Sequence, residues 1–337
     1  MNAAIIAFSE RGCALGEQIV DYFAQRGDMA GLTRCPSGGL AEWTKAHFHH
    51  DALIFIGACG IAVRAIAPFL AGKTKDPAVV VIDELGIHVV SLLSGHTGGA
   101  NHLTVSLADF LQATPVITSA TDVHGIFAID TWAAMRGIRI ANPEHIKGIS
   151  GRLLAGETIA VNSIFPVAGP LPDGFRLGDH EEDVLISCFN REDKETLQLI
   201  PPVVTLGIGC KKDVPVESIE EAFEHTLKKA NCHPLAIERV CSIRQKEKEP
   251  GILEFCRRKS FDYQTFSVQE LMAVPGTYTS SGFVKEITGV DNVCERSAVL
   301  GSGAGGQLLL GKTALNGVTM ALAISPYTIS FEEADEV

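Results

Sequence analysis

The stretch Leu92-Leu-Ser-Gly-His-Thr-Gly-Gly-Ala-Asn-His-Leu103 joins an apolar segment to a helix-forming one through a glycine-rich loop. Residues 88–93 predict a short strand, residues 103–111 predict a helix, and Asn101 is a typical N-cap. A strand, a glycine loop and a helix start allow backbone N–H groups to converge on an anion. His96 places a titratable imidazole in that loop, where it could act on the bound group. The alternative is a tight turn that exposes a histidine.

The same alternation of strands and helices continues on both sides of this loop. Apolar runs predict strands at 3–8, 52–56, 78–82, 88–93 and 115–118, with helices at 16–26, 40–48, 61–70, 103–111 and 125–136. Near-continuous apolar strands alternating with helices predict an α/β domain: a mostly parallel sheet covered on both faces. Ligands bind beyond the carboxyl ends of strands in such sheets. Three loops fit that rule: 57–60, 83–86 and 94–101.

Two further regions follow this N-terminal α/β domain, which we place at residues 1–138. A middle segment, 139–201, has two predicted strands around a loop rich in glycine and proline, and it shows no obvious chemistry. Pro201 and Pro202 mark a boundary, because adjacent prolines end either kind of element. A second α/β domain is predicted at 202–330, closing with a hairpin between 308–310 and 318–324.

Composition narrows the possible functions of the chain. It has 337 residues, 46% of them hydrophobic and 20% charged, as expected for a globular protein of two or three domains. No apolar run is long enough to span a membrane, and the N-terminus does not resemble a signal peptide. Nine irregularly spaced cysteines suggest reduced thiols in the cytoplasm. A net charge of −12 argues against nucleic-acid binding, although gathered basic residues could still bind a small anion.

Nucleotide-binding signatures also occur in the chain. Residues 306–313 spell a P-loop, but three leucines suited to a strand stand inside it. Gly301, Gly303 and Gly306 spell a dinucleotide fingerprint, but a predicted helix precedes them where a strand is required. We therefore interpret the loop 301–306 as close backbone packing or as backbone donors to a ligand. A P-loop nucleotide enzyme remains an alternative.

Metal and nucleophile sites have weaker support. His47, His49 and His50 lie close together, yet their spacing fits no common zinc pattern, and a solvated cluster is the simpler interpretation. Cys59 could be a nucleophile, but its neighbours offer no base, so a buried thiol is the default. Several basic residues near predicted loops could bind carboxylates: Arg64, Lys73, Lys75, Lys211, Lys212, Lys285 and Lys312.

Motifs along most of the chain resemble one family. Residues 57–68, 75–83 and 94–101 resemble the N-terminal domain of the CbiG family, the cobalt-precorrin-5A hydrolases of anaerobic cobalamin biosynthesis. After the double proline, residues 206–212, 289–295 and 303–308 are similar to the C-terminal domain that this family shares with CobE of the aerobic pathway. The motifs occur in the family's order, and only residues 2–48 are weakly diagnostic.

This resemblance implies that water opens the δ-lactone of cobalt-precorrin-5A, a tetrapyrrole on its way to the corrin ring, and that acetaldehyde is released to leave cobalt-precorrin-5B. His96 is then the candidate general base, and the N–H groups of Gly98 and Gly99 are candidate donors to the oxyanion. Asp83 could transfer a proton to or from the departing two-carbon unit. Asn101 could orient the substrate or the imidazole.

The substrate that this resemblance implies is a polyanionic cobalt-corrinoid, so basic side chains are expected to face it, with loops 207–212 and 301–306 closing from the second domain. The predicted substrate-binding residues are Gly57, Cys59, Gly60, Arg64, Gly95, Thr97, Gly98, Gly99, Gly209, Lys211, Lys212, Gly303, Gly305 and Gly306. Cobalt arrives within the substrate, so no cofactor or protein-bound metal is expected. Neither nucleic acid nor membrane is an expected partner, and a homodimer is possible. A non-catalytic corrinoid carrier is the alternative function.

Overall fold

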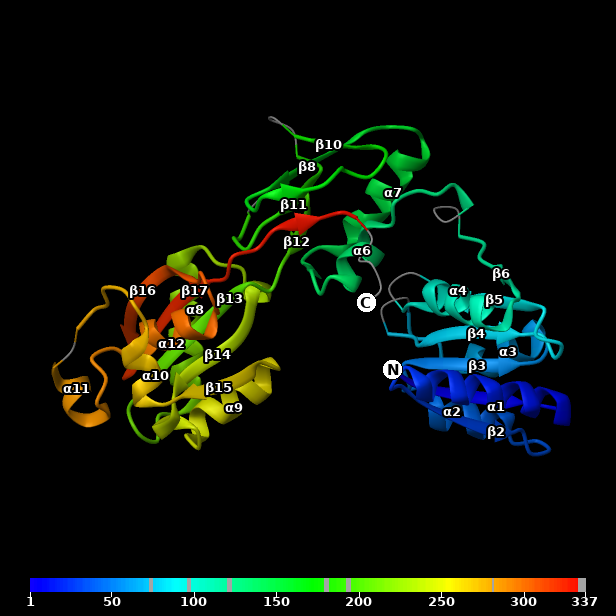
Figure 1. The fold of residues 1–337 in the computed structure, drawn as a ribbon, viewed down its shortest axis with the longest axis horizontal. Helices are drawn as coiled ribbons and strands as arrows, with labels where there is room; N and C mark the ends of the chain where they lie inside the picture. Colours follow the sequence, from blue (N-terminus) through cyan, green and yellow to red (C-terminus); the bar gives the residue numbers. More distant parts are fainter. Residues whose placement is uncertain are drawn as a thin grey trace. The chain divides into compact units, whose positions relative to one another are not determined.

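The computed structural model describes residues 1–72, 75–95, 98–119, 123–178, 182–191, 195–280 and 282–332. The chain divides into two compact units, Met1–Ala134 and Met135–Val337, which are described separately (Figure 1). The first unit ends four residues before the predicted boundary, and the second contains both the predicted middle segment and the C-terminal domain. Across the described ranges, no helix combines the length and the apolar character needed to cross a membrane.

The described part of the first unit is built on a six-stranded sheet with the order β2-β1-β3-β4-β5-β6. Its strands are β1 (Asn2–Ala7), β2 (Met29–Arg34), β3 (Ala52–Ile56), β4 (Ala78–Ile82), β5 (His88–Leu93) and β6 (Thr114–Val116). Its helices are α1 (Glu10–Gln25), α2 (Leu40–His47), α3 (Cys59–Ile66), the 3-10 turn η1 (Ala67–Phe69) and α4 (Ala100–Leu111), and α6 (Ile129–Met135) spans the boundary.

Both faces of this sheet are covered, as predicted. Helices α1 and α4 pack on one face, where Phe23 and Leu107 meet alternate residues of β1, β3 and β4. Helices α2 and α3 cover the other face, where Trp43 and Ile66 meet the intervening residues, among them Phe55. All five residues of β3 and all five of β4 are buried. Their uninterrupted apolar sequences follow from this burial on both sides.

The direction of β5 differs from that of the strands before it. Strands β1 to β4 pair in parallel, whereas β5 pairs with β4 in antiparallel fashion, and β6 then runs parallel to β5. The loop after β5 therefore lies at the edge of the sheet opposite the loops after β3 and β4. The hydroxyl of Ser94 confirms this placement, because it donates to the carbonyl of Asp76, just before β4, at 3.0 Å.

The second unit begins with a five-stranded sheet of order β10-β8-β11-β12-β7, which forms from the predicted middle segment. Its strands are β7 (Arg139–Ile140), β8 (Ile159–Ser163), β10 (Phe175–Leu177), β11 (Val184–Ile186) and β12 (Leu197–Ile200). The turn η2 (Pro143–His145) and helix α7 (Ile146–Leu154) precede β8, and β9 (Val167–Ala168) pairs with β18 (Ile329–Ser330).

The second sheet of this unit has the order β15-β14-β13-β17-β16. Its strands are β13 (Val204–Cys210), β14 (Ile237–Ile243), β15 (Asp262–Phe266), β16 (Gln307–Leu315) and β17 (Val318–Ile324). The helical elements are α8 (Val216–Ala230), η3 (Pro234–Ala236), η4 (Arg244–Lys246), α9 (Pro250–Lys259), α10 (Val268–Ala273), α11 (Gly282–Thr288) and α12 (Val293–Gly301). Strands β16 and β17 form the predicted hairpin. The P-loop interpretation of residues 306–313 is wrong, because Lys312 and Thr313 lie within β16 and the next element is strand β17, where a P-loop requires a helix.

Helix α12 lies unusually close to the sheet. A Cβ atom on Gly207 of β13 would stand 1.8 Å from the carbonyl oxygen of Cys294, and one on Gly301 would stand 2.3 Å from the Sγ atom of Cys241. Both positions therefore require glycine, since any side chain would force the helix away from the strands. This contact fixes α12 across the middle of the sheet.

Candidate functional site

The glycine loop after β5 folds back on itself before α4 begins. His96 and Thr97 lie outside the described residues, so their predicted roles remain predictions. The N–H of Ala100 donates to the carbonyl of Ser94 at 3.1 Å, and the N–H of Asn101 donates to the carbonyl of Gly95 at 2.9 Å. Two of the first N–H groups of α4 are thus used inside the loop. An anion bound here would depend on other donors of the loop.

Gly95 and Gly98 are required by this tight fold. A Cβ atom at position 95 would lie 2.6 Å from Oδ1 of Asn101, and one at position 98 would lie 2.8 Å from the carbonyl oxygen of Ser94. Gly99 has φ of +81°, a conformation that glycine adopts without strain. Packing and backbone conformation therefore account for all three glycines. Donation from the N–H groups of Gly98 and Gly99 to an oxyanion stays a prediction.

Asn101 is not the N-cap of α4, contrary to the prediction. Gly99 occupies the cap position because its left-handed backbone lets the helix start at Ala100. The Asn101 side chain instead accepts a hydrogen bond from Oγ of Ser91 at 2.7 Å and donates to Oγ of Ser119 at 3.4 Å. It therefore ties β5 to the segment that follows β6, beside the glycine loop.

Asp76, which was not among the predicted site residues, anchors a neighbouring loop at the same edge. Its buried carboxylate accepts the N–H groups of Ala71 at 2.8 Å and Gly72 at 3.2 Å, while its carbonyl accepts the Ser94 hydroxyl. The segment that carries Lys75 is thereby held next to the glycine loop. The sequence signal for Asp76 was its position directly before Pro77, which precedes the apolar run 78–82.

The other predicted residues of the first unit lie at the opposite edge. The N–H of Gly57 donates to the carbonyl of Ile82 at 2.8 Å, which continues the pairing of β3 with β4. Exposed Cys59 begins α3, followed by Gly60, and Arg64 is exposed in the last turn of that helix. These residues surround the carboxyl ends of β1 and β3, between which the strand order reverses.

Asp83 also lies at this second edge, where it closes the turn between β4 and β5. Its carboxylate accepts the N–H groups of Leu85 at 2.9 Å, Ile87 at 3.1 Å and His88 at 2.5 Å. Partial burial raises the pKa of Asp83, but these N–H donors outweigh that effect and lower it below its ordinary value. The five residues of β4, about 16 Å of extended chain, separate Asp83 from the glycine loop. The structure does not bring Asp83 and Asn101 together.

Replacing Asp83 with asparagine should destabilise the first unit by about 1–2 kcal/mol at pH 7, because an amide cannot accept all three N–H groups. The side chain is 37% exposed, so solvent screening keeps the loss within this modest range. The pKa of Asp83 is lower in the folded protein than its ordinary value of 3.8. The stabilisation by its carboxylate is therefore fully present at pH values above 3.8 and is lost as the pH falls through the pKa of the folded state. Urea unfolding at pH 7 and pH 3 should show the difference between the proteins shrinking in acid.

The exposed Asp109 of α4, changed to asparagine, is a matched control, since its carboxylate has no hydrogen-bond partner within the described ranges. Equal unfolding midpoints for Asp83→Asn and Asp109→Asn at pH 7 would show that the turn does not depend on this carboxylate.

In the second unit, the two predicted loops lie at opposite ends of β13. Exposed Lys211 and Lys212 follow its carboxyl end, and the N–H of Lys211 donates to the carbonyl of Gly317 at 3.1 Å. Gly209 lies nearby, where a Cβ atom would stand 2.9 Å from Oγ1 of Thr319. The loop 301–306 follows the C-terminal end of α12 and lies near the start of β13, because Gly301 approaches the side chain of Thr205.

The glycines of loop 301–306 serve the local turn. A Cβ atom on Gly305 would lie 2.9 Å from Cγ of Pro326, and one on Gly306 would lie 1.9 Å from Oγ of Ser302. Gly303 has φ of +79° and accepts the N–H of Gly306 at 3.1 Å. These contacts favour the packing interpretation of the loop, and ligand binding by these glycines stays a prediction.

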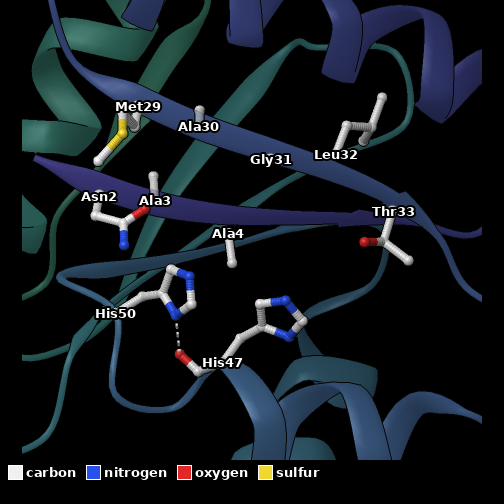
Figure 2. A pocket seen from close by; sticks show the side chains of 10 residues that line it. All are labelled: Asn2, Ala3, Ala4, Met29, Ala30, Gly31, Leu32, Thr33, His47 and His50. Carbon is white, nitrogen blue, oxygen red and sulfur yellow. Dashed lines mark hydrogen bonds between the residues drawn. The ribbon is translucent and has the colours of Figure 1, made fainter.

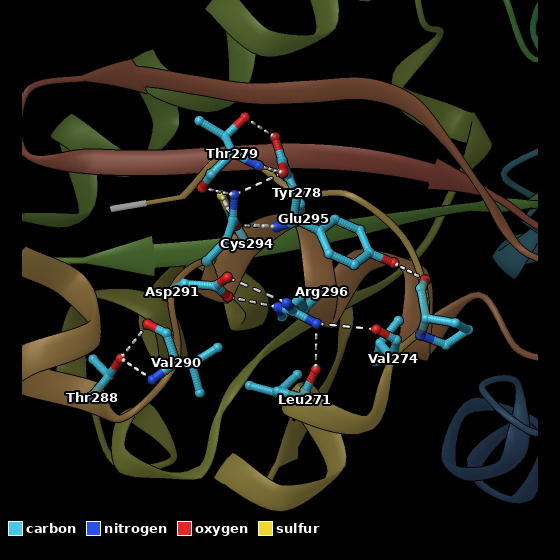
Figure 3. A network of polar contacts seen from close by, with 12 residues as sticks. Leu271, Val274, Tyr278, Thr279, Thr288, Val290, Asp291, Cys294, Glu295 and Arg296 are labelled. Atoms are coloured by element: carbon cyan, nitrogen blue, oxygen red, sulfur yellow. Dashed lines mark hydrogen bonds and ion pairs between the residues drawn. The ribbon is translucent and has the colours of Figure 1, made fainter. Parts of the chain in front are cut away.

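A buried carboxylate at the start of α12 also escaped the sequence analysis (Figure 3). Glu295 is 2% exposed and accepts four hydrogen bonds, from the N–H and hydroxyl of Thr279 at 2.8 and 2.9 Å, from Nδ2 of Asn292 at 2.7 Å, and from the N–H of Lys312 at 2.7 Å. Its carboxylate thus joins α12, β16 and the segment before α11. Asn292 also caps the helix by accepting the N–H of Glu295.

Arg296, the next residue, fixes the other side of this network. Its guanidinium pairs with Asp291 at 2.8 Å and donates to the carbonyls of Leu271 and Val274 at 3.2 and 3.0 Å. The Tyr278 ring lies 4.6 Å from the guanidinium carbon, close enough for a cation–π contact (Figure 3). The segment from α10 to Thr279 is therefore held against α12, whose first turn adjoins Gly209.

Two family models match this chain, and each match lies within one of the two units. Residues 42–122 match the family model described as "Cobalamin synthesis G N-terminal", and residues 204–323 match "Cobalamin synthesis G C-terminus". A cobalt-precorrin-5A hydrolase of Salmonella typhimurium is 37% identical over 306 residues, covering 86% of both chains. The protein of the same name from Priestia megaterium is 30% identical, covering 96% of this chain and 95% of the other.

A solved structure also matches along the chain. The crystal structure of a cobalamin biosynthesis protein G homolog from Sulfolobus solfataricus is 27% identical and covers 96% of this chain and 97% of the other, with a TM-score of 0.43.

Proposed function

This chain belongs to the CbiG family of cobalamin-synthesis proteins, and we propose that it is a cobalt-precorrin-5A hydrolase that releases acetaldehyde. The observation that carries the proposal is similarity to a hydrolase of that name across 86% of the chain, which takes in both units. A carrier would need only a surface for the tetrapyrrole. The similarity to this hydrolase extends over both units, the first of which contains the glycine loop, and this favours the hydrolase over the carrier.

The proposed reaction adds one water molecule and releases one acetaldehyde. Water attacks the carbonyl carbon of the δ-lactone, the ester C–O bond breaks, and a carboxylate and a hydroxyl result. The carbon–carbon bond to the two-carbon unit then breaks, and the freed ring carbon takes up a proton as acetaldehyde leaves. This makes the protein a hydrolase acting on a carbon–carbon bond, with cobalt-precorrin-5B as product.

We assign the general base to His96, because water attack at neutral pH needs a group of near-neutral pKa. The N–H groups of Gly98 and Gly99 are the proposed donors to the oxyanion of the opening lactone. Asn101 is held beside the loop by Ser91 and Ser119, so it is suited to orienting the imidazole or the substrate. A proton-transfer role for Asp83 is still a prediction, and its place in the turn at the other edge argues against it.

We propose that the reaction needs no cofactor of the protein, because cobalt arrives in the substrate. The decisive experiment supplies cobalt-precorrin-5A to the purified protein and measures acetaldehyde with a coupled alcohol dehydrogenase. Acetaldehyde equal to the substrate consumed is the expected result. Tight binding of the tetrapyrrole without acetaldehyde would instead identify a carrier.

Changing Lys211 and Lys212 together to glutamate should raise KM about 10- to 100-fold with a smaller effect on kcat, because the substrate carries many carboxylates. Both side chains are exposed at the carboxyl end of β13, and no ion pair involves them in the described part of the chain. Steady-state kinetics would measure the effect.

A matched control changes Lys228 and Lys229, two exposed lysines in the last turn of α8, to glutamate. The net charge then changes equally in both variants. Identical KM values for the two double variants would remove Lys211 and Lys212 from the binding surface.

A further inference from the structure

The histidine cluster of the first unit is accounted for by local contacts. His47 and His50 are half-buried beside a hollow of about 300 Å³ at strands β1 and β2 (Figure 2), whereas His49 is exposed. Nδ1 of His47 donates to the carbonyl of Trp43 at 2.8 Å, and Nδ1 of His50 donates to the carbonyl of His47 at 3.1 Å. The prediction of a solvated cluster therefore holds for His49 alone of the three. The polar contacts that bear on the proposed function lie in the second unit.

A buried glutamate in the second unit adjoins the loop that carries Lys211 and Lys212. Glu249 is 6% exposed and occupies the N-cap position of α9, but its carboxylate is bonded outside that helix. Oε1 accepts the N–H of Asp213 at 2.7 Å, and Oε2 pairs with Nζ of Lys246 at 2.7 Å. A buried carboxylate is costly unless it is paired, and here both oxygens are used. Glu249 therefore ties the loop after β13 to the turn before α9.

The backbone of Asp213 shows why the loop needs this partner. Its φ of +57° lies in the left-handed region, which residues other than glycine adopt at a cost, although aspartate bears it better than most. The hydrogen bond from its N–H to the charged carboxylate of Glu249 offsets this cost. A strained residue persists only where its surroundings hold it, so the loop is fixed in one conformation directly after the two lysines.

Two further contacts hold this loop at its ends. The N–H of Lys211 donates to the carbonyl of Gly317 at 3.1 Å, and Cδ of Lys211 lies 3.3 Å from the place that a Cβ atom on that glycine would take. At the other end, a Cβ atom on Gly251 of α9 would stand 2.3 Å from the carbonyl oxygen of Val214. The loop is thus packed between the β16–β17 turn and the first turn of α9.

We propose that Glu249 is a positioning residue for substrate binding, which holds the loop so that Lys211 and Lys212 present their ammonium groups to the carboxylates of the tetrapyrrole. This inference rests on the proposed function, which supplies the anionic substrate. Lysine side chains lose rotamer freedom when they bind, and a loop that is already ordered avoids the further cost of ordering its backbone. Lys246 compensates the charge of Glu249, which would otherwise oppose a carboxylate bound by the two lysines.

Limited digestion of the full chain with trypsin, which cleaves after lysine, tests the loop without the substrate. In Glu249→Gln, cleavage after Lys211 and Lys212 should be about 10-fold faster, because a glutamine cannot keep both contacts of the carboxylate. Cleavage after Lys228 and Lys229, exposed in the last turn of α8, is the internal reference and should keep its rate. General unfolding would accelerate both cleavages equally and would overturn the proposal.

Glu247→Gln is the matched control for this digestion. It removes an exposed carboxylate two positions away, which has no hydrogen-bond or ion-pair partner among the described residues. Its cleavage rates should equal those of the unaltered protein. If Glu249→Gln is cleaved after Lys211 and Lys212 no faster than Glu247→Gln, Glu249 does not hold the loop.

Titration with cobalt-precorrin-5A, followed by absorption, tests the link to the substrate. Kd should rise about 10-fold in Glu249→Gln, whereas adding this change to a Lys211→Ala/Lys212→Ala protein should have no further effect, because no lysine is left to position. An unchanged Kd, or an equal rise in both backgrounds, would overturn the proposal. Acetaldehyde is measured in the same samples. Unaltered protein that binds the tetrapyrrole without releasing acetaldehyde would refute the hydrolase, and the dependence of Kd on Glu249 would still support the positioning role.

Discussion

Alanine at position 96 is expected to lower kcat for acetaldehyde release about 10²- to 10⁴-fold, the usual contribution of a general base. The other polar side chains of residues 94–101 are those of Ser94, Thr97 and Asn101, and none of them has an ordinary pKa near neutral pH. Binding of the tetrapyrrole should change little, because the charges expected to hold it lie elsewhere. The assay is single-turnover acetaldehyde release, together with a binding titration of the same substrate.

Two further measurements make this test specific. His225→Gln, which changes an exposed histidine of α8 in the other unit, should keep full activity. The pH dependence of kcat in the unaltered protein should rise through one ionisation near neutral pH, and that step should be lost from the residual activity of His96→Ala. A variant that retains its kcat and its pH profile would exclude His96 as the base.

Unfolding of the second unit should become about 3–5 kcal/mol more favourable in Glu295→Gln, because a buried acceptor of four hydrogen bonds becomes partly a donor. In the position of Oε2, the new amide nitrogen would face the N–H of Thr279 and the amide of Asn292. In the position of Oε1, it would face the N–H of Lys312. Those donors would be buried without partners, at a cost of about 1–3 kcal/mol each. Urea denaturation followed by far-UV circular dichroism measures the loss.

The exposed Glu224 of α8 provides the matched change, because Glu224→Gln also removes one carboxylate from a helix of this unit. Its denaturation midpoint should stay near that of the unaltered protein. If Glu295→Gln unfolds at the same urea concentration as Glu224→Gln, the network around α12 does not stabilise the unit.

The strands of the first unit could be predicted where the chain is buried on both sides. Residues 52–56 and 78–82 are apolar throughout, and both form buried strands of the predicted length. Strand β2 was missed because it is an edge strand whose exposed and partly buried residues interrupt any apolar run. A strand that is buried on both faces leaves a clear signal in the sequence, and a partly exposed outermost strand leaves a weak one.

The direction of β5 could have been predicted from the length of its connection. Only five residues, 83–87, join β4 to β5, whereas a parallel connection needs a crossover of a dozen or more. An apolar run gives no information on strand direction, and a fully parallel sheet would bring all three predicted loops to the same edge. The connecting length shows that the loop 94–101 belongs at the other.

Residues that act through distant partners could not be identified from the sequence. Glu295 and Arg296 stand together in a helix, as exposed pairs often do, and only the fold brings Thr279, Lys312 and Leu271 to them. The same limit applies to glycines. Gly207 and Gly209 looked like part of a ligand loop, whereas in the structure neighbouring atoms leave no room for a Cβ atom at either position.

The short connection between β4 and β5 also bears on the order in which the first unit assembles. Ile82 pairs with Val89 only seven positions away, whereas Ala3 must find Ala52 across nearly fifty. Closing the shorter stretch costs less chain entropy, and hairpins of this kind form within microseconds. We therefore expect the β4–β5 hairpin, and with it the segment that carries the glycine loop, to form before the N-terminal strands join the sheet.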